Sequence, residues 1–287
     1  MLINFTTNWR RSFLPLLAIG LASLAILPIA AILCQIVAQG VPHFRWQLLV
    51  TLPTAVDTTT ATGFVNNSLS GFAHAIVGTG LMVSLALLFS LPLGVITGIY
   101  LSEFPDRFAP VIRIAMGILS SSPSIVIGLF AYGVVVTRVG FSALAGGFAL
   151  AFICLPIIAL NTAEALQQVP AIYRTASLAL GITPTATLRR IVIPNAWQGI
   201  STGVLLALAR SAGETAPLLF TALSSLYFPQ GLVGSPAPSL AVTIYRYASS
   251  PFPPQQNQAW TIALVLVVTI LLLNAVANYV RHHHRSV

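Results

Sequence analysis

The chain has 287 residues, of which 56% are hydrophobic and only 6% are charged. Soluble domains carry about 25% charged residues, so this composition excludes an ordinary soluble domain and predicts an all-α integral membrane protein. All thirteen basic residues are arginines, and a Walker A phosphate loop, which requires a lysine, is therefore excluded, so any ATP has to be bound by a partner. The net charge of +8 is typical of cytoplasmic loops that face anionic lipid and requires no nucleic acid.

The first membrane span is predicted at residues 13–37. Arg10 and Arg11 precede an apolar run that is long enough to cross the ~30 Å hydrocarbon core of a bilayer. A secretory signal peptide begins in the same way, but its apolar region has only about 7 to 15 residues, so we expect this helix to be retained. Residues 40–69 mix apolar residues with polar ones and a threonine-rich run, and are predicted to form a loop on the outer side that can contain a short amphipathic piece.

The second span is predicted at residues 71–101 and is followed by a short charged segment. Small residues near helical spacing in this span allow close helix contact. Arg107 and Arg113 place the charged segment on the cytoplasmic side. We interpret Glu103 and Asp106 as solvated partners of these two arginines.

The third span, predicted at residues 114–136, contains a serine cluster around a proline. Pro123 removes one helix hydrogen bond, and a broken helix is tolerated in a membrane only against protein or water. Ser122 and Ser124 are therefore candidates for a solute pathway, although a plain kink against a neighbouring helix would explain the same residues. The fourth span is predicted at residues 142–160.

The segment 161–194 is polar, bears arginines and is too amphipathic to cross a membrane. Pro170 opens a short helix that Gly181 can end in a left-handed conformation. Pro184 begins a second short helix, which Pro194 is expected to stop. The exposed arginines of this segment are predicted to be Arg174, Arg189 and Arg190. Two short helices joined at a glycine predict a cytoplasmic knob; the alternative is a hairpin that lies on the membrane surface without a partner.

The fifth span, predicted at residues 198–223, carries two opposite charges. Arg210 and Glu214 are four residues apart, which places both on one helix face. A charged side chain at mid-bilayer costs roughly 2.5 to 3.5 kcal/mol, so it faces a protein interior or a water-filled path. The two residues either neutralise each other as a structural pair or serve in the passage of a charged solute. Gly213 and Pro217, which can bend the helix, favour the second interpretation.

Residues 224–258 are rich in proline, glycine and serine and are predicted to form a long outer loop with a short or re-entrant helix. The sixth span follows at residues 260–280. The arginines in segments placed inside are Arg10, Arg11, Arg107, Arg113, Arg174, Arg189, Arg190, Arg281 and Arg285, whereas Arg45, Arg138 and Arg246 lie outside. This bias predicts that residues 1–287 form a single transmembrane domain of six spans with both termini in the cytoplasm.

The cytoplasmic knob resembles the EAA loop of ABC importer permeases. The pattern of that loop is Glu-Ala-Ala, three residues, Gly, nine residues and Ile-x-Leu-Pro, and this chain keeps the spacing. The matching residues are Thr175-Ala176-Ser177, Gly181 and Ile191-Val192-Ile193-Pro194. Thr175 stands in place of the glutamate and Ile193 in place of the leucine.

Two further stretches are similar to the PstA-type permeases of phosphate importers. They are Ser122-Pro123-Ser124-Ile125-Val126 with Gly128-Leu129-Phe130, and Arg210 with Gly213-Glu214-Thr215-Ala216-Pro217-Leu218. The sibling PstC-type family shares Arg-x-x-Gly-Glu-Thr but is not expected to continue with Ala-Pro-Leu. The resemblance covers residues 70–280 and implies the MetI-like fold of a type I ABC importer permease.

This resemblance implies a permease half in a bacterial inner membrane that works with other chains. The implied partners are a homologous PstC-type permease, two cytoplasmic PstB-type ATPases and an external PstS-type phosphate-binding protein. No cofactor or metal is implied, and ATP hydrolysis belongs to the partner ATPases. The knob would dock its ATPase through Ile172, Arg174, Ala176, Ala179, Gly181, Leu188, Ile191 and Pro194.

The resemblance also implies a role for the charged residues of the fifth span. Arg210 would face the path of the phosphate anion, and Glu214 would hold that arginine and stop the anion from binding too tightly to leave. Ser122 and Ser124 complete the predicted pathway. A permease for sulfate or molybdate, or the PstC-type sibling, would fit the same residue types. In other classes, a structural membrane scaffold would not need the two charges, and an intramembrane enzyme would need a nucleophile with a base or a metal-binding set, which the sequence does not show.

Overall fold

A computed structural model describes residues 3–53, 71–104 and 106–283. Within these ranges the regular elements are helices and no strand occurs, which confirms the all-α prediction. The elements are α1 (Ile3–Gly40), η1 (Trp46–Leu49), α2 (Ala73–Glu103), α3 (Ala109–Ser121), α4 (Ser124–Ala131), η2 (Tyr132–Val136), α5 (Thr137–Val139), α6 (Ala143–Gln167), α7 (Ala171–Ala179), α8 (Pro184–Thr187), η3 (Leu188–Val192), α9 (Ile193–Ala212), α10 (Ala216–Thr221), α11 (Leu240–Ala248) and α12 (Pro253–His283). The short element η1 is a 3-10 helix, and η2 and η3 are π-helical.

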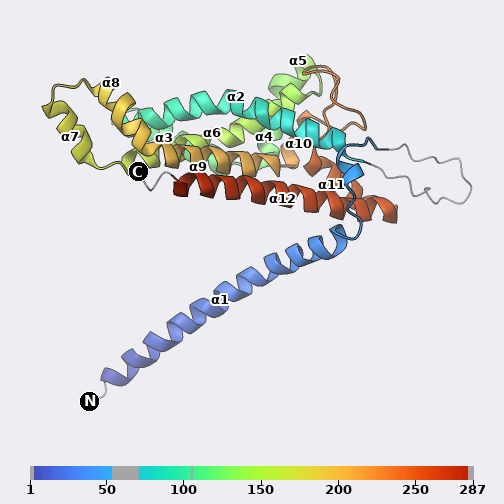
Figure 1. The fold of residues 1–287 in the computed structure, drawn as a ribbon, viewed down its shortest axis with the longest axis horizontal. Helices are drawn as coiled ribbons and strands as arrows, with labels where there is room; N and C mark the ends of the chain where they lie inside the picture. The colour runs from blue at the N-terminus through green and yellow to red at the C-terminus, as the bar shows by residue number, and fades with distance from the viewer. Residues whose placement is uncertain (1–2, 54–70, 105, 284–287) are drawn as a thin grey trace, which may run out of the picture.

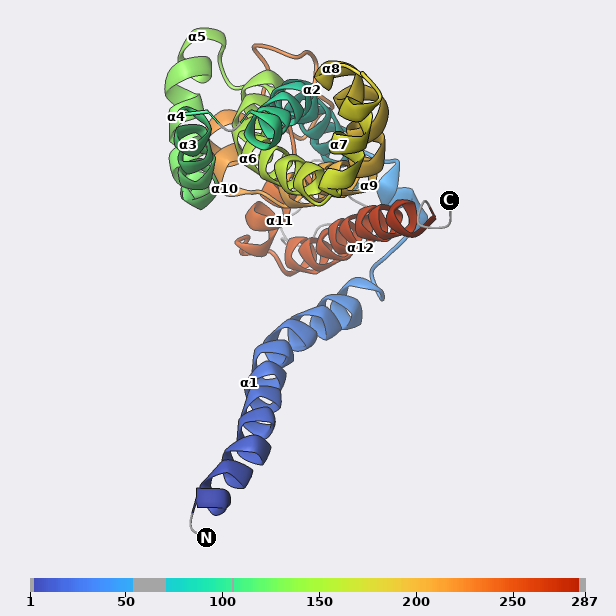
Figure 2. The same cartoon turned by 90° about the vertical axis from the view of Figure 1, so that its left-hand side faces the viewer.

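The long helices α2, α6, α9 and α12 run along the long axis of the molecule and form a bundle (Figures 1 and 2). Helix α6 is the most enclosed of the membrane-spanning candidates, with 67% of its apolar window buried. Glycines let α2 lie close to it, because a Cβ at Gly94 would be 2.8 Å from Cβ of Ile158 and one at Gly98 would overlap Thr162. Such small residues support helix packing where lipid removes the hydrophobic driving force between helices.

Among the described residues, five helices are long and apolar enough to cross a membrane, or six if one bent pair is counted as a single span. The bent pair joins α3 to the stretch Ser124–Val139, and the chain bends by 100° between them. The corner is Ser122 and Pro123, which have extended backbone conformations. The third predicted span is therefore a broken helix, as the proline and its serine neighbours indicated.

Helix α1 projects away from the bundle and meets it at its C-terminal end (Figures 1 and 2). There Gly40 lies against Trp260 and Leu264 of α12. Only 6% of the apolar window that begins at Ile19 is buried. A helix that is apolar on all sides and uncovered by its own chain belongs in lipid or against another chain.

Helix α6 continues to Gln167, so the prediction that the fourth span ends at residue 160 is wrong. The added turns are amphipathic, since Leu166 is fully buried and Glu164 is exposed. The Asn161 side chain donates a hydrogen bond to the Ile157 carbonyl at 2.8 Å. Polar residues that satisfy themselves along the helix therefore do not end it.

The second helix of the knob does not stop at Pro194. From Pro184 the chain stays helical through α8, η3 and α9 to Ala212. Pro194 lies in the first turn of α9, directly after the π-helical η3. A proline has no N–H to donate and is tolerated in a first turn, so the predicted stop is wrong and the knob merges into the fifth span.

The fifth predicted span is broken rather than continuous. Helix α9 ends before Gly213, whose amide donates to the Arg210 carbonyl at 3.1 Å, and α10 begins after Thr215. Pro217 then occupies the first turn of α10. The prediction of one helix over residues 198–223 is therefore wrong, because the glycine and the proline together interrupt the helix.

The segments predicted to lie outside differ less from expectation. Helix α11 is a short helix inside residues 224–258, and α12 begins at Pro253, before the predicted start of the sixth span at residue 260. Residues 54–70, in the first predicted outer loop, and residues 284–287, in the basic tail, lie outside the described residues.

Candidate functional site

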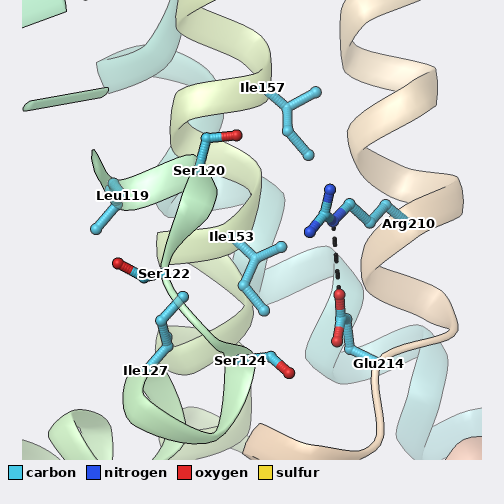
Figure 3. A pocket seen from close by; sticks show the side chains of 9 residues that line it. All are labelled: Leu119, Ser120, Ser122, Ser124, Ile127, Ile153, Ile157, Arg210 and Glu214. Atoms are coloured by element: carbon cyan, nitrogen blue, oxygen red, sulfur yellow. Dashed lines mark ion pairs between the residues drawn. The ribbon is translucent and has the colours of Figure 1, made fainter. Parts of the chain in front are cut away.

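A small pocket lies between α3, α4, α6 and the junction of α9 with α10 (Figure 3). Its walls combine apolar side chains, hydroxyl groups and one pair of opposite charges. The lining residues are Leu119, Ser120, Ser122, Ser124, Ile127, Ile153, Ile157, Arg210 and Glu214. The structure thus brings to one pocket all four residues that the sequence suggested for a solute pathway, two from the serine cluster and two from the charged segment.

Arg210 and Glu214 form the charged wall of the pocket. Nε of Arg210 lies 3.5 Å from Oε1 of Glu214, so the ion pair exists although the helix ends between the two residues. The Arg210 side chain is 53% exposed and the Glu214 side chain is 18% exposed. Because the carboxylate contacts Nε, the outer nitrogens of the guanidinium are turned toward the opposite wall (Figure 3).

The serine wall faces this pair across the pocket. In Figure 3 the hydroxyls of Ser120 and Ser124 point to the side where Arg210 and Glu214 lie, whereas the hydroxyl of Ser122 points away. The Ser122 hydroxyl instead donates to the Ile118 carbonyl at 2.8 Å and supports the last turn of α3. Ser120 is therefore a pocket residue that the sequence did not single out, and Ser122 contributes its position more than its hydroxyl.

Two broken helices meet beside the pocket. A Cβ on Gly128 of α4 would lie 2.7 Å from Cα of Pro217 in α10, so the two short helices touch through their backbones. The first turn of α4 begins at Ser124 on the pocket wall, where the helix end adds partial positive charge. Irregular backbone in a membrane requires protein or water to satisfy its polar groups. The pocket therefore interrupts the apolar interior with a partly polar surface.

The second predicted site is the cytoplasmic knob, and α7 is its exposed part. Ile172 is 68% exposed, and Ala176 and Ala179 are also exposed. The buried position of α7 is Ser177, whose hydroxyl donates to the Tyr173 carbonyl at 2.7 Å. The helix thus turns its small polar side inward and leaves its apolar side uncovered, which is the reverse of a helix on a soluble surface.

Further exposed apolar residues on α7 and at its end are Tyr173, Leu178 and Leu180, which the sequence did not single out. Leu188, predicted for docking, packs against the core cluster that contains Val192 and Ala196. Ile191 is half-buried, whereas Pro194 is exposed. Of the residues predicted for docking, the exposed apolar ones therefore lie on α7 more than on the second helix of the knob.

Gly181 ends α7 in the predicted left-handed conformation, with φ of 74°. The Gly181 amide donates to the Leu178 carbonyl and the Ile182 amide to the Ser177 carbonyl, both at 3.0 Å, as in a Schellman motif. The motif fixes the direction in which the chain leaves α7 toward α8. Only a residue that accepts positive φ fits this position.

The acidic residues at the end of α2 and just after it, Glu103 and Asp106, do not have the predicted partners. Glu103 contacts Arg174, with 2.7 Å between Oε1 and Nη2, and Asp106 accepts a hydrogen bond from the Tyr100 hydroxyl at 2.7 Å. Asp106 also accepts from the Ala109 amide at 3.0 Å at the start of α3. The hydrogen bond from Tyr100 and, to a smaller extent, those from the Ala109 and Phe108 amides hold the pKa of Asp106 below its ordinary value. The interpretation of both acids as solvated partners of nearby arginines is wrong, and Arg174 is turned inward, toward the end of α2.

Comparison with known proteins places this arrangement in a class. Residues 90–285 match the family described as "Binding-protein-dependent transport system inner membrane component". A solved structure titled "Inward facing conformations of the MetNI methionine ABC transporter" aligns with a TM-score of 0.55, 18% identity and coverage of 74% of this chain and 93% of that chain. The fold is thus that of a MetI-like ABC importer permease, which confirms the predicted fold.

Relatives that are similar in sequence show which kind of ABC importer permease this is. The phosphate transport system permease protein PstA of Yersinia pestis is 40% identical over 244 residues, with 82% of each chain covered. PstA of Haemophilus influenzae is 35% identical over 289 residues, with 98% of each chain covered. A probable PstA of Methanocaldococcus jannaschii is 37% identical over 266 residues, covering 91% of this chain and 89% of the relative. The chain belongs to the PstA family of ABC importer permeases.

Proposed function

We propose that this chain is the permease subunit of an ATP-driven phosphate importer and forms half of its translocation pathway. The observation that carries the proposal is Arg210, a guanidinium that lies with Glu214 on a polar pocket inside a membrane protein. The substrate named for the PstA relatives, phosphate, is an anion that an arginine binds well. Family and pocket chemistry therefore support the same solute.

The geometry suggests how the anion would be held and released. The outer guanidinium nitrogens of Arg210 and the hydroxyls of Ser120 and Ser124 are available as donors to phosphate oxygens (Figure 3). Glu214 keeps the guanidinium in place and repels the anion, so that binding stays weak enough for release. Ile153 and Ile157 of α6 also line the pocket, and they add apolar surface without adding charge.

Arg210 is 53% exposed within this single chain, which supports a path that a second chain completes. Such a charge would be costly against lipid. The largely uncovered α1 gives further apolar surface for a neighbouring chain. We propose a PstC-type permease as that neighbour and an external PstS-type protein as the source of phosphate.

The exposed apolar side of α7 is proposed as the docking helix for a PstB-type ATPase, one of two in the complex. Ile172, Ala176 and Ala179 would enter a groove of the ATPase, and closure of the ATPases on ATP would rock the permease helices. ATP hydrolysis takes place on these partners, so this chain is a transporter subunit and not an enzyme.

We place the protein in the inner membrane of a bacterial cell, and the same arrangement supports a cytoplasmic position for both termini. The start of α1, the end of α12 and the docking helix α7 all lie toward one end of the molecule (Figure 1). Arg189 and Arg190 are exposed on η3, which follows α7 and α8 in the chain, and arginines favour the cytoplasmic side.

Uptake of labelled phosphate by the assembled importer tests the pathway. An Arg210→Gln variant is expected to lose about 10- to 100-fold of the transport rate, because a hydrogen bond to a charged group contributes about 1.5 to 3 kcal/mol. Arg210→Lys, which keeps the charge, should retain part of the rate. The matched control Arg138→Gln removes an exposed arginine outside the pocket and should transport normally. Normal uptake by Arg210→Gln in an intact complex would refute the role of Arg210.

The choice between phosphate and another oxyanion is tested by competition. Unlabelled phosphate should abolish uptake of labelled phosphate by the full complex, whereas an equal concentration of sulfate or molybdate should leave it unchanged. Uptake of labelled sulfate instead would assign the permease to the alternative oxyanion.

Docking is tested separately by purification. Ala176→Arg introduces a charge into the apolar side of α7 and should prevent the ATPase from co-purifying. Arg113→Glu, a charge change at an exposed position on α3, serves as the control and should leave the complex intact.

A further inference from the structure

Arg174 projects from the docking helix α7 toward the membrane helices. Its Nη2 lies 2.7 Å from Oε1 of Glu103, at the end of α2, and its Nε lies 3.4 Å from Oε2. Nη2 also donates to the Leu166 carbonyl and Nη1 to the Val169 carbonyl, both at 3.0 Å. One guanidinium therefore joins α7, the end of α2 and the end of α6.

The contact differs from an ordinary surface ion pair. The side chains of Arg174 and Glu103 are only 26% and 18% exposed. Two guanidinium nitrogens meet two carboxylate oxygens, which fixes the relative orientation of the groups as well as their distance. The Leu166 carbonyl in the last turn of α6 and the Val169 carbonyl just after that helix add acceptors for the same charge. Partial burial and four hydrogen bonds hold α7 more firmly than a solvated pair would.

The corner to which Arg174 is attached is also where α3 begins. Asp106 receives the Tyr100 hydroxyl from α2 at 2.7 Å and accepts the Ala109 amide of α3 at 3.0 Å. Helix α3 then runs 13 residues to the serine wall, where Ser120 lines the pocket. A continuous set of contacts thus leads from the docking helix through the end of α2 into the helix that forms one side of the pocket.

We propose that Arg174 is a positioning residue that couples the docking helix to the pocket. When an ATPase displaces α7, the ion pair with Glu103 carries the displacement to the corner between α2 and α3 and moves the serine wall relative to Arg210. The inference rests on the proposed function, since it takes α7 as the docking helix. It assigns Arg174 to force transmission inside this chain and not to contact with the ATPase.

The test uses the whole importer in proteoliposomes and measures the phosphate transported per ATP hydrolysed. Arg174→Gln and Glu103→Gln should each lower this ratio by about five- to tenfold, within the range of coupling between distant sites. Co-purification of the ATPase should stay within about twofold of the natural chain, because α7 keeps its apolar side. Arg189→Gln, an exposed arginine of the same knob, is the matched control and should leave the ratio unchanged.

The charge exchange Glu103→Arg with Arg174→Glu separates mutual pairing from a separate role of each residue. It should recover part of the ratio lost in the single variants, and only part, because the exchanged glutamate cannot donate to the Leu166 and Val169 carbonyls. A natural ratio in both single variants would overturn the inference. Loss of the ATPase from Arg174→Gln, with no rescue by the exchange, would also overturn it by placing Arg174 at the ATPase surface.

Failure of the inference is distinct from failure of the proposed function. If Ala176→Arg keeps its ATPase, or if the natural complex moves no phosphate with ATP, the proposed docking or transport is wrong. If those experiments succeed while the Arg174 and Glu103 variants transport at the natural ratio, only the coupling role is wrong.

Discussion

The α2–α6 pair and the pair of broken helices beside it solve the problem of packing in a membrane in different ways. Helices α2 and α6 stay regular and approach through glycines such as Gly94 and Gly98. The α3–α4 and α9–α10 segments are interrupted, and they meet at Gly128 and Pro217 beside Arg210. Regular helices satisfy their own backbone groups, whereas the interrupted ones expose polar groups where a solute can use them. Stability is thus concentrated in the first pair and the proposed pathway in the second.

The largest expected effect is a loss of stability when the contact between the regular helices α2 and α6 is disturbed. Gly98→Ala would place a methyl group against the Ala159 carbonyl, 2.6 Å away, and against Thr162. Overpacking of this kind costs about 1 to 3 kcal/mol or more, so we expect a lower thermal midpoint and less folded protein in detergent. The matched control is Gly80→Ala on the same helix, where no atom lies within 4 Å. Equal midpoints for the two variants would show that α2 and α6 are not held by this contact.

An intermediate effect, chiefly on phosphate uptake, is expected when the contact between the broken helices is disturbed. Gly128→Ala should push α10 away from α4 and shift the junction that carries Glu214, since its Cβ would lie 2.7 Å from Cα of Pro217. We expect phosphate uptake to fall about tenfold, equivalent to 1.4 kcal/mol, with a smaller loss of stability than in Gly98→Ala. Gly133→Ala, with no neighbouring atom within 4 Å, is the control. A variant that unfolds as readily as Gly98→Ala would remove the distinction between the two pairs.

The smallest effect is a pH-dependent change in stability at the start of α3, where Asp106 caps the helix. Its pKa is lowered, chiefly by the hydrogen bond from Tyr100, so the carboxylate stabilises the fold above the ordinary pKa of an aspartate. That stabilisation is lost as the pH falls through the lowered pKa. Asp106→Asn should therefore be less stable than the natural chain near neutral pH, and the difference should shrink under acid. Thermal midpoints measured across the acidic range check this; a difference independent of pH would contradict it.

The charges in the fifth span were a strong sequence signal, because an arginine and a glutamate in an apolar run require a polar surrounding. They led directly to the pocket, as did the proline with its serines. The orientation of the hydroxyls could not be predicted, because the Ser122 hydroxyl folds back onto the Ile118 carbonyl, whereas the Ser120 hydroxyl points to the side where Arg210 lies. The sequence therefore identified the segments of the site but not the role of each hydroxyl.

The ion pair between Arg174 and Glu103 was not predictable from the sequence, because the residues are 71 positions apart and each lies near closer charges. The helix limits were missed for a related reason. Pro194 has the composition of a stop signal, but its position in the first turn of α9, after a π-helical turn, lets the helix continue. In each case the outcome depends on contacts with elements that are distant in the sequence.

Thr175, which occupies the glutamate position of the EAA pattern, folds its hydroxyl back onto the carbonyls of Ile172 and Ala171, at 3.1 and 3.4 Å. The outward side of α7 therefore presents no ionic group at this point. An ATPase held there would be retained by exclusion of water and not by Coulomb attraction. The affinity of the ATPase for this helix should change little with sodium chloride concentration, increase in sulfate salts and decrease at low temperature.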